Sequence, residues 1–149
     1  LSVKKIWDTA PHNAFTDLIR FQEQWFCIFR EAKVHVGDNG KIRILVSQDG
    51  ETWQSAALLE EDGVDLRDPK LCITPDGRLM CVIGRNVFRG TELREFKTRV
   101  SFSADGLNWS TPQPILEEGD WLWRVTWHKN RAYGVIYKVF GKNAPERIL

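Results

Sequence analysis

The sequence predicts an all-β protein built from repeated four-stranded antiparallel units. Short apolar runs rich in Val, Ile, Phe, Trp and Thr alternate with turn residues, and no segment keeps the period of an amphipathic helix. The chain also repeats itself. The segment "SQDGETW" at 47–53 returns as "SADGLNW" at 103–109, and the elements around both copies follow the same order.

The first unit is predicted over about residues 14–60. Its strands are "FTDLIRF", "WFCIFR", "KIRILVS" and "QSAALLE". A polar loop from Glu31 to Gly40 separates the second strand from the third. Residues 1–13 precede this unit and contain a candidate outer strand for a neighbouring unit.

The second unit is predicted over about residues 65–118, with strands "LRDPKLCI", "RLMCVIGR", "KTRVSFS" and "STPQPILEE" and a loop from Asn86 to Glu95. An incomplete third unit, about 121–149, contains "LWRVTWH" and "RAYGVIYK" before a loop at 139–146. Four-stranded units repeating at about 40–55 residues are typical of a β-propeller. Because propellers usually have at least four blades, about two and a half blades form a partial propeller. The missing blades are expected from the rest of a longer chain or from a homo-oligomer.

The two repeated segments are predicted to be structural turns between the third and fourth strands. Each Asp can accept backbone N–H bonds, each Gly permits a positive φ, each Ser can tie the strand ends, and each Trp returns to the sheet as a large apolar group. The residues are Ser47, Asp49, Gly50 and Trp53 in one copy and Ser103, Asp105, Gly106 and Trp109 in the other. A calcium loop needs more carboxylates than these, so we expect no metal.

Composition excludes several partners. Lys and Arg total 21 against 20 Asp and Glu, a net charge of +1, so nucleic acid is not an expected partner. No apolar run approaches the roughly 20 residues of a membrane span, and we expect no membrane association. Nothing in the sequence indicates a cofactor.

Three cysteines without CxxC spacing argue against a zinc site. Cys72 and Cys81 flank the turn "TPDG", and a two-residue loop would place them opposite each other. A type I turn with Gly77 in the left-handed position instead pairs Cys72 with Met80 and turns Cys81 to the other face. We favour the second register, with buried free thiols.

The repeated segments resemble the Asp-box, or BNR repeat, of sialidases (neuraminidases). The stretch "LRDPKLCITPDGRLMCVIGR" is also similar to the sialidase pattern in which an Arg-Ile-Pro motif opens the innermost strand. Arg67-Asp68-Pro69 departs from that motif at its middle residue. The resemblance implies a propeller with glycoside hydrolase activity of the exo-sialidase type and an acidic sugar as substrate.

The resemblance also places Arg67 among the arginines that hold the sugar carboxylate. Repeat position alone adds Arg30, Arg85 and Arg124 to the same end of the propeller, which we call the rim. His35 lies in the first loop at this end. Several guanidinium groups around one point suit a carboxylate. The alternative is that each arginine forms a structural ion pair, such as Arg67 with Asp17 or Asp68.

The catalytic carboxylate is less well defined. The family's acid/base Asp lies in the loop after the second strand, and the loop at 86–95 has none. Glu92 or Glu95 is a substitute there, the alternative being that each is a solvated loop charge. Asp38, Glu31 and Asp68 are the candidates elsewhere. Both tyrosines, Tyr133 and Tyr137, lie in one strand and are expected to be core or interface residues.

Three functions therefore stay open. The first is a sialidase-like glycoside hydrolase, or its N-terminal portion, that binds an acidic sugar through an arginine-rich rim. The second is a non-catalytic glycan- or protein-binding propeller. The third is an inactive fragment.

Overall fold

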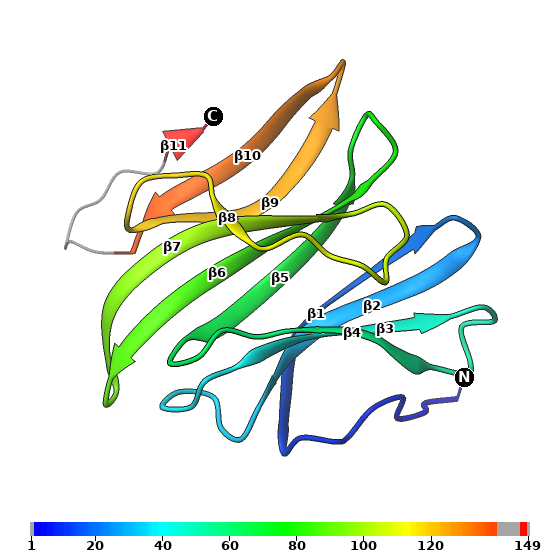
Figure 1. The fold of residues 1–149 in the computed structure, drawn as a ribbon, viewed down its shortest axis with the longest axis horizontal. Coiled ribbons are helices and arrows are strands. Elements are labelled where there is room, and N and C mark those ends of the chain that lie inside the picture. Colours follow the sequence, from blue (N-terminus) through cyan, green and yellow to red (C-terminus); the bar gives the residue numbers. More distant parts are fainter. Residues whose placement is uncertain (1, 140–146, 149) are drawn as a thin grey trace.

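The chain folds into three antiparallel sheets that lie side by side in chain order (Figure 1). The structure is a computed structural model and describes residues 2–139 and 147–148. Across those residues there are strands and turns but no helix, and hence none that is long and apolar enough to cross a membrane. The three sheets do not close into a ring. The predicted fold class, an all-β partial propeller, is confirmed.

The first two sheets are four-stranded blades in which neighbours in sequence are neighbours in space. The first contains β1 (His12–Phe21), β2 (Gln24–Ala32), β3 (Lys41–Ser47) and β4 (Gln54–Leu59). The second contains β5 (Asp65–Ile73), β6 (Leu79–Arg89), β7 (Glu92–Ser103) and β8 (Gln113–Pro114).

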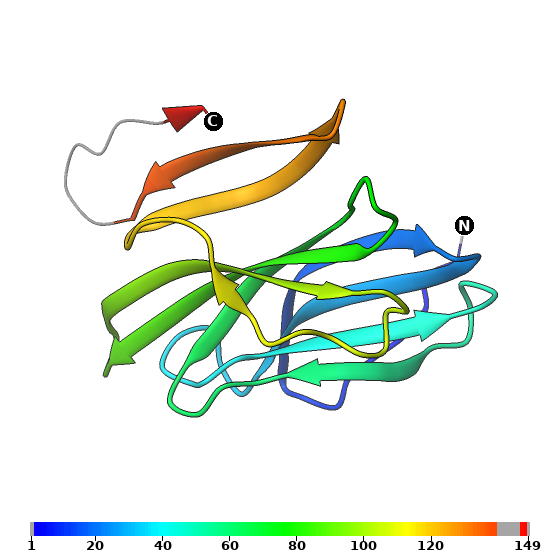
Figure 2. The same cartoon turned by 45° about the horizontal axis from the view of Figure 1, so that its top comes forward.

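The third sheet has three described strands, β9 (Asp120–His128), β10 (Arg131–Lys138) and β11 (Arg147–Ile148). Figure 2 shows it as a separate layer beyond the second blade. The first strand of each sheet lies on the inner side, because β5 contacts both β1 and β9. The predicted loop at 139–146 lies outside the described residues from position 140 onward.

Two apolar cores hold the sheets together. One lies between the first and second blades and includes Phe26, Ile28, Leu79, Cys81 and Ile83. The other lies between the second blade and the third sheet and includes Met80, Val82, Val100, Leu122, Val125 and Ile136. Successive β6 side chains thus point alternately into the two cores, which explains its uninterrupted apolar sequence.

The predicted cysteine register is confirmed. Cys72 pairs with Met80 across β5 and β6, so Cys81 points to the opposite face. The turn between these strands has Gly77 at a φ of 77° and a hydrogen bond from Thr74 N to the Arg78 carbonyl. Cys27, Cys72 and Cys81 are all free thiols in the described chain.

The loop predicted from Asn86 to Glu95 was wrong, because these residues extend β6 and β7 into a long hairpin. Asn86 pairs with Phe96, and Arg89 pairs with Glu92 across a tight turn at Gly90 and Thr91. Gly90 has a φ of 63°, as tight hairpin turns require. Val87, Phe88 and Phe96, on either side of this glycine, are of residue types enriched in strands.

The Ser-x-Asp-Gly turns have the predicted geometry. Asp49 accepts hydrogen bonds from the backbone N–H groups of Glu51 and Thr52 at 2.8 and 2.7 Å, and Asp105 does the same for Leu107 and Asn108. These bonds hold the pKa values of both carboxyls well below their usual range. Further contacts repeat in both copies: each Ser hydroxyl donates to the Asp and accepts from the Gly N–H, and each Trp indole donates to the Gly carbonyl. Gly50 and Gly106 both have a φ of 77°.

The N-terminal segment lies on the outer face of the first blade. Trp7 packs there against Cys27, Phe29 and Leu45. Residues 2–11 contain no strand in this structure, so their role as an outer strand stays a prediction.

Each inner strand carries a bulge at the same place. The pairing jumps from Ala14 to Asp17 in β1, from Arg67 to Lys70 in β5 and from Leu122 to Val125 in β9, while the partner strand advances by two residues. This register aligns three residues, which we call the bulge residues: Phe15, Asp68 and Trp123. Bulges redirect side chains and often occur next to sites.

The bulges correct the repeat alignment drawn from sequence. Arg67 corresponds to Leu122 rather than to Arg124. Arg30 pairs with Ala14 whereas Gly84 pairs with Arg67, so Arg30 corresponds to Gly84 and not to Arg85. A shift of one residue in a strand reverses the face, so Arg30 and Arg85 lie on opposite faces of their blades.

Candidate functional site

Arg30 organises the loop that follows β2. Its side chain is fully buried, with Nε 2.7 Å from Asp65 Oδ1, and its other nitrogens donate to the carbonyls of Val34 at 3.0 Å and Asp38 at 3.4 Å. Gly40 N also donates to Asp65 Oδ1 at 3.0 Å. A Cβ at position 40 would lie 2.3 Å from Arg30 Nε, so only glycine allows this approach. The loop is therefore held against β5.

Arg67 shares the same buried carboxylate. Its Nε lies 3.0 Å from Asp65 Oδ2, and its Nη2 donates to the carbonyl of His35 in the loop that Arg30 organises. Its guanidinium lies over the rings of Phe15 and Phe88, at 5.8 and 5.9 Å from their centroids. Arg67 is only 8% exposed. One carboxylate thus faces two guanidinium groups, and Asp68 is a second acidic group near Arg67.

Asp68 lies next to Arg67 on the inner strand. It is half-buried and adopts a left-handed φ of 50°, and no described residue forms a hydrogen bond or ion pair with its carboxylate. Burial raises the pKa of Asp68, while the charges of Arg67 and Lys70 oppose that rise. A carboxyl with a raised pKa holds a proton at a higher pH than an exposed Asp, which is the property of a general acid.

Aromatic side chains of the third sheet lie near Asp68. Trp121 stacks on Phe96 with ring centroids 4.7 Å apart, and Tyr137 lies 6.1 Å from Trp121 and 6.0 Å from Trp123. Burial and the charge of Asp68 together raise the pKa of the Tyr137 hydroxyl, so Tyr137 is within electrostatic reach of Asp68. Trp123, at the open end of this cluster, is 47% exposed.

Two histidines lie on the first-blade side of the site. The rings of His12 and His35 are 5.4 Å apart, and His35 lies 5.7 Å from Phe15. In the part of the chain that the structure describes, no group of three or more His, Cys, Asp or Glu side chains is suited to a metal ion. The site therefore offers hydrogen-bonding and aromatic groups rather than a metal cage.

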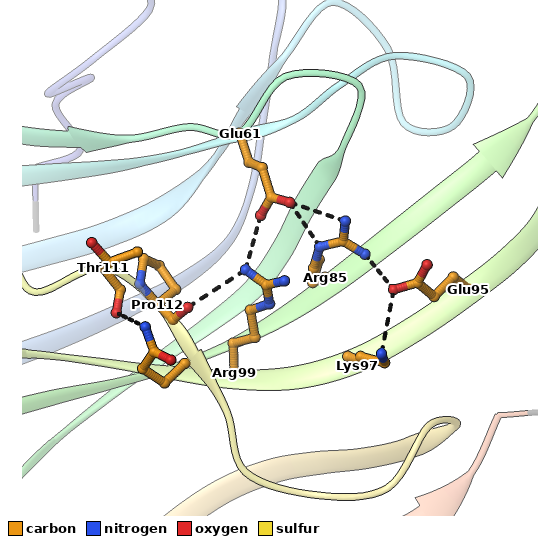
Figure 3. Close-up of polar contacts among 8 residues, drawn as sticks. Glu61, Arg85, Glu95, Lys97, Arg99, Thr111 and Pro112 are labelled. Carbon is orange, nitrogen blue, oxygen red and sulfur yellow. Dashed lines mark hydrogen bonds and ion pairs between the residues drawn. The ribbon is translucent and has the colours of Figure 1, made fainter.

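Arg85 belongs to a different network (Figure 3). Its Nε lies 3.0 Å from Glu61 and its Nη1 2.6 Å from Glu95, while Arg99 lies 3.1 Å from the second oxygen of Glu61. Glu61 comes from the connection between β4 and β5. The network fastens this connection to the second blade and leaves Arg85 with two carboxylate partners.

Arg124 is half-exposed and pairs with Asp17 at 2.7 Å. Asp17 also accepts a hydrogen bond from Leu71 N at 2.9 Å, so this carboxylate connects all three inner strands. The four predicted rim arginines therefore do not converge on one point. Arg30 and Arg67 share Asp65, and Arg85 and Arg124 have other partners.

The three candidate catalytic carboxylates Asp68, Glu31 and Glu92 do not lie together in the structure either. Glu31 points away from Arg30 on the other face of β2 and pairs with Arg43 at 2.6 Å. Glu92 stands at the tip of the β6–β7 hairpin, 63% exposed, and pairs with Arg94 at 2.7 Å. Of the three, only Asp68 lies beside Arg67, and the His35 carbonyl accepts a hydrogen bond from Arg67.

Sequence reasoning missed several residues of this cluster: Phe15, Asp65, Phe88, Trp123 and Tyr137. The sequence held one signal for Asp65, because Asp65 and Asp120 both stand at the start of an inner strand. In the structure both are buried and both pair with a cation. The aromatic residues carried no such signal, because their alignment depends on bulges that appear only in the pairing register.

Comparisons with known proteins support the fold. No family model matches the chain, and no curated protein matches it. A solved structure described as a glycosyl hydrolase from Bacteroides ovatus is similar to it, with a TM-score of 0.53 and 12% sequence identity over 85% of this chain and 43% of that one. A structure described as a putative glycosidase from Bacteroides thetaiotaomicron matches with a TM-score of 0.40 and 10% identity, over 89% of this chain and 63% of that one. The chain thus spans less than two thirds of either structure, and its fold is similar to that of the first.

Proposed function

We propose that this chain forms part of the sugar-binding and catalytic centre of a sialidase-like glycoside hydrolase, with Asp68 as the proton-transferring carboxyl. One observation carries the proposal: Asp68 is half-buried on an inner strand with no described partner for its carboxylate. Glycoside hydrolysis needs a carboxyl that can protonate the leaving oxygen, and burial favours the protonated form.

An acidic sugar is the proposed substrate class. Arg30 and Arg67 face the single carboxylate of Asp65, and Lys70 lies close by, with Nζ 3.4 Å from the carbonyls of Phe15 and Thr16. A sugar carboxylate complements these cationic groups. We assign the binding of the sugar carboxylate to Arg67, since Arg30 is fully buried.

The two Ser-x-Asp-Gly turns support the sialidase-like part of the proposal. Both copies have the same hydrogen bonds and the same φ at glycine, as expected of Asp-boxes. The similarity to a glycosyl hydrolase structure agrees at the level of the fold.

A non-catalytic glycan-binding propeller is the second candidate. Hydrolysis requires another nucleophilic or basic group across the scissile bond. Among the described residues, two other candidate catalytic carboxylates, Glu31 and Glu92, have cationic partners. In either case we propose that further blades, from a longer chain or a second copy, complete the propeller. The mass in solution measured by light scattering shows whether a second copy supplies them.

The test of catalysis is turnover of 4-methylumbelliferyl glycosides of N-acetylneuraminic acid, glucuronic acid and galactose by the wild type and by Asp68→Asn. Asn tolerates the left-handed backbone, so the variant removes the proton and keeps the conformation. We expect kcat to fall about 100-fold or more, the usual contribution of acid–base catalysis. Asp62→Asn, in an exposed turn, is the matched control and should retain full activity.

Two results would count against the proposal. An Asp68→Asn variant that turns over at the wild-type rate excludes the proton-transfer role. If the wild type binds glycosides of the panel but cleaves none of them, the glycan-binding candidate replaces the catalytic proposal.

A further inference from the structure

We propose that Phe15 and Trp123 form the two sides of a stacking subsite for the C–H face of a pyranose ring, with Asp68 between them. This inference rests on the proposed function and extends it to two residues that neither the sequence motifs nor the comparisons assign. The strand register carries it, because the same bulge position holds Phe15 on β1, Asp68 on β5 and Trp123 on β9.

The three bulge residues are neighbours in space as well as in register. Strand β5 lies against β1 on one side and against β9 on the other. The Phe15 carbonyl accepts from Lys70 Nζ, two residues beyond Asp68, and the Phe15 ring lies against Arg67, one residue before it. On the other side, the Trp123 ring lies 6.0 Å from that of Tyr137, and the charge of Asp68 contributes to the raised pKa of the Tyr137 hydroxyl. The strands on both sides of the one that carries Asp68 therefore have an aromatic residue at the matching bulge position.

Phe15 is held in a conformation that has a cost. Its φ is 63°, in the left-handed region that bulky residues rarely adopt. Such strain persists where the surrounding structure fixes it, and it is concentrated at ligand sites. Arg67 and His35 contact the Phe15 ring on the site side, so the ring is positioned rather than free to rotate away.

Trp123 is supported from behind and open in front. Trp121 and Tyr137 lie 5.4 and 6.0 Å from its ring, and Trp121 stacks in turn on the buried Phe96. About half of the Trp123 surface nevertheless faces solvent. A large exposed indole on a rigid aromatic base provides a prearranged flat surface with a negative π-face, which suits the slightly positive C–H groups of a sugar ring.

The test measures binding by saturation-transfer NMR and by titration, with the methyl glycosides of N-acetylneuraminic acid, glucuronic acid and galactose as probes. We expect the ring C–H protons of the bound glycoside to receive the strongest saturation. Trp123→Ala should weaken its affinity about tenfold, and Trp123→Phe, which keeps an aromatic face, should recover most of the loss. Phe15→Ala should also weaken binding. Tyr133→Ala, another exposed aromatic on the same sheet, is the matched control and should bind as the wild type does.

The outcomes separate the two proposals. A glycoside that binds the wild type and Trp123→Ala equally, while Asp68→Asn still loses turnover, overturns the stacking subsite and leaves the proposed function intact. A wild type that binds none of the three glycosides overturns both. Circular dichroism of each variant shows whether it is folded, and Trp123→Phe tests the subsite in a variant that keeps an aromatic ring at position 123.

Discussion

At the scale of single residues, the site is a contrast between two neighbouring aspartates. Asp65 is buried with two arginines, whereas Asp68, three positions on, is half-buried and has no described partner. The first carboxylate is held by ion pairs with Arg30 and Arg67, whereas burial raises the pKa of the second. Asp65 has a structural role, and Asp68 is the carboxyl to which we assign proton transfer in the proposed function.

Asp68→Asn should make the folded protein more stable at neutral pH. Because burial raises the pKa of Asp68 in the folded state, the folded chain holds this proton more tightly than the unfolded chain. The wild type therefore loses stability as pH rises through the window between the unfolded and folded pKa values, and Asn has no such loss. The free energy of urea unfolding should favour the variant at pH 7, with the advantage disappearing below about pH 4. A variant less stable than the wild type at pH 7 would show that the ionised carboxylate is stabilising.

Asp65→Asn should destabilise the fold strongly. The substitution removes the carboxylate that pairs with the buried guanidinium groups of Arg30 and Arg67, and breaking one side of a buried pair costs about 3–5 kcal/mol. The control is Glu60→Gln, which removes the exposed Lys41–Glu60 pair and should cost far less, because solvent screens an exposed ion pair. Equal losses in urea unfolding would contradict the role given to Asp65.

At the scale of elements, turns and bulges have different tasks. The Ser-x-Asp-Gly turn of the second blade lies against the first blade, because Gly106 approaches the ring of Phe26. The corresponding turn of the first blade has no such contact at Gly50, whose nearest neighbour is Trp25. The bulges lie instead on the inner strands, where they align Phe15, Asp68 and Trp123.

The two glycines give a matched pair of variants. Both have a φ of 77°, so Ala at either position has the same backbone strain. At position 106 a Cβ would also lie 2.2 Å from Phe26 Cε1, whereas at position 50 the nearest atom is 3.8 Å away. We expect Gly106→Ala to cost about 2–4 kcal/mol and Gly50→Ala about 1 kcal/mol in thermal or urea unfolding. Similar losses for both would mean that the second turn does not fasten the blades.

At the scale of the whole molecule, three sheets pack face to face around their first strands. The two cores between them are continuous through β6, which contributes side chains to both. The site lies where β1, β5 and β9 meet, and it receives residues from all three sheets. The arrangement of the site residues therefore depends on how the three sheets pack as well as on each strand.

The sequence predicted this architecture through its period and its turns, and it failed where one residue of register matters. The repeated turns and the strand order were visible because apolar alternation and glycine positions are local signals. The arginine rim was not predictable, because bulges shift the alignment so that Arg30 corresponds to Gly84 and Arg67 to Leu122. The partners of Arg85 and Arg124 come from distant segments, which local patterns do not reveal.

The most direct test of the account is a carboxyl carbon-13 NMR titration of Asp68, assigned with Asp68→Asn and repeated with a saturating methyl glycoside of N-acetylneuraminic acid. We expect a midpoint above the usual value for Asp in the free protein and a changed Asp68 signal when the glycoside binds. A midpoint at or below that of an exposed aspartate such as Asp62, with no response to any glycoside of the panel, would contradict the claim that Asp68 is the proton-transferring carboxyl of a sugar site.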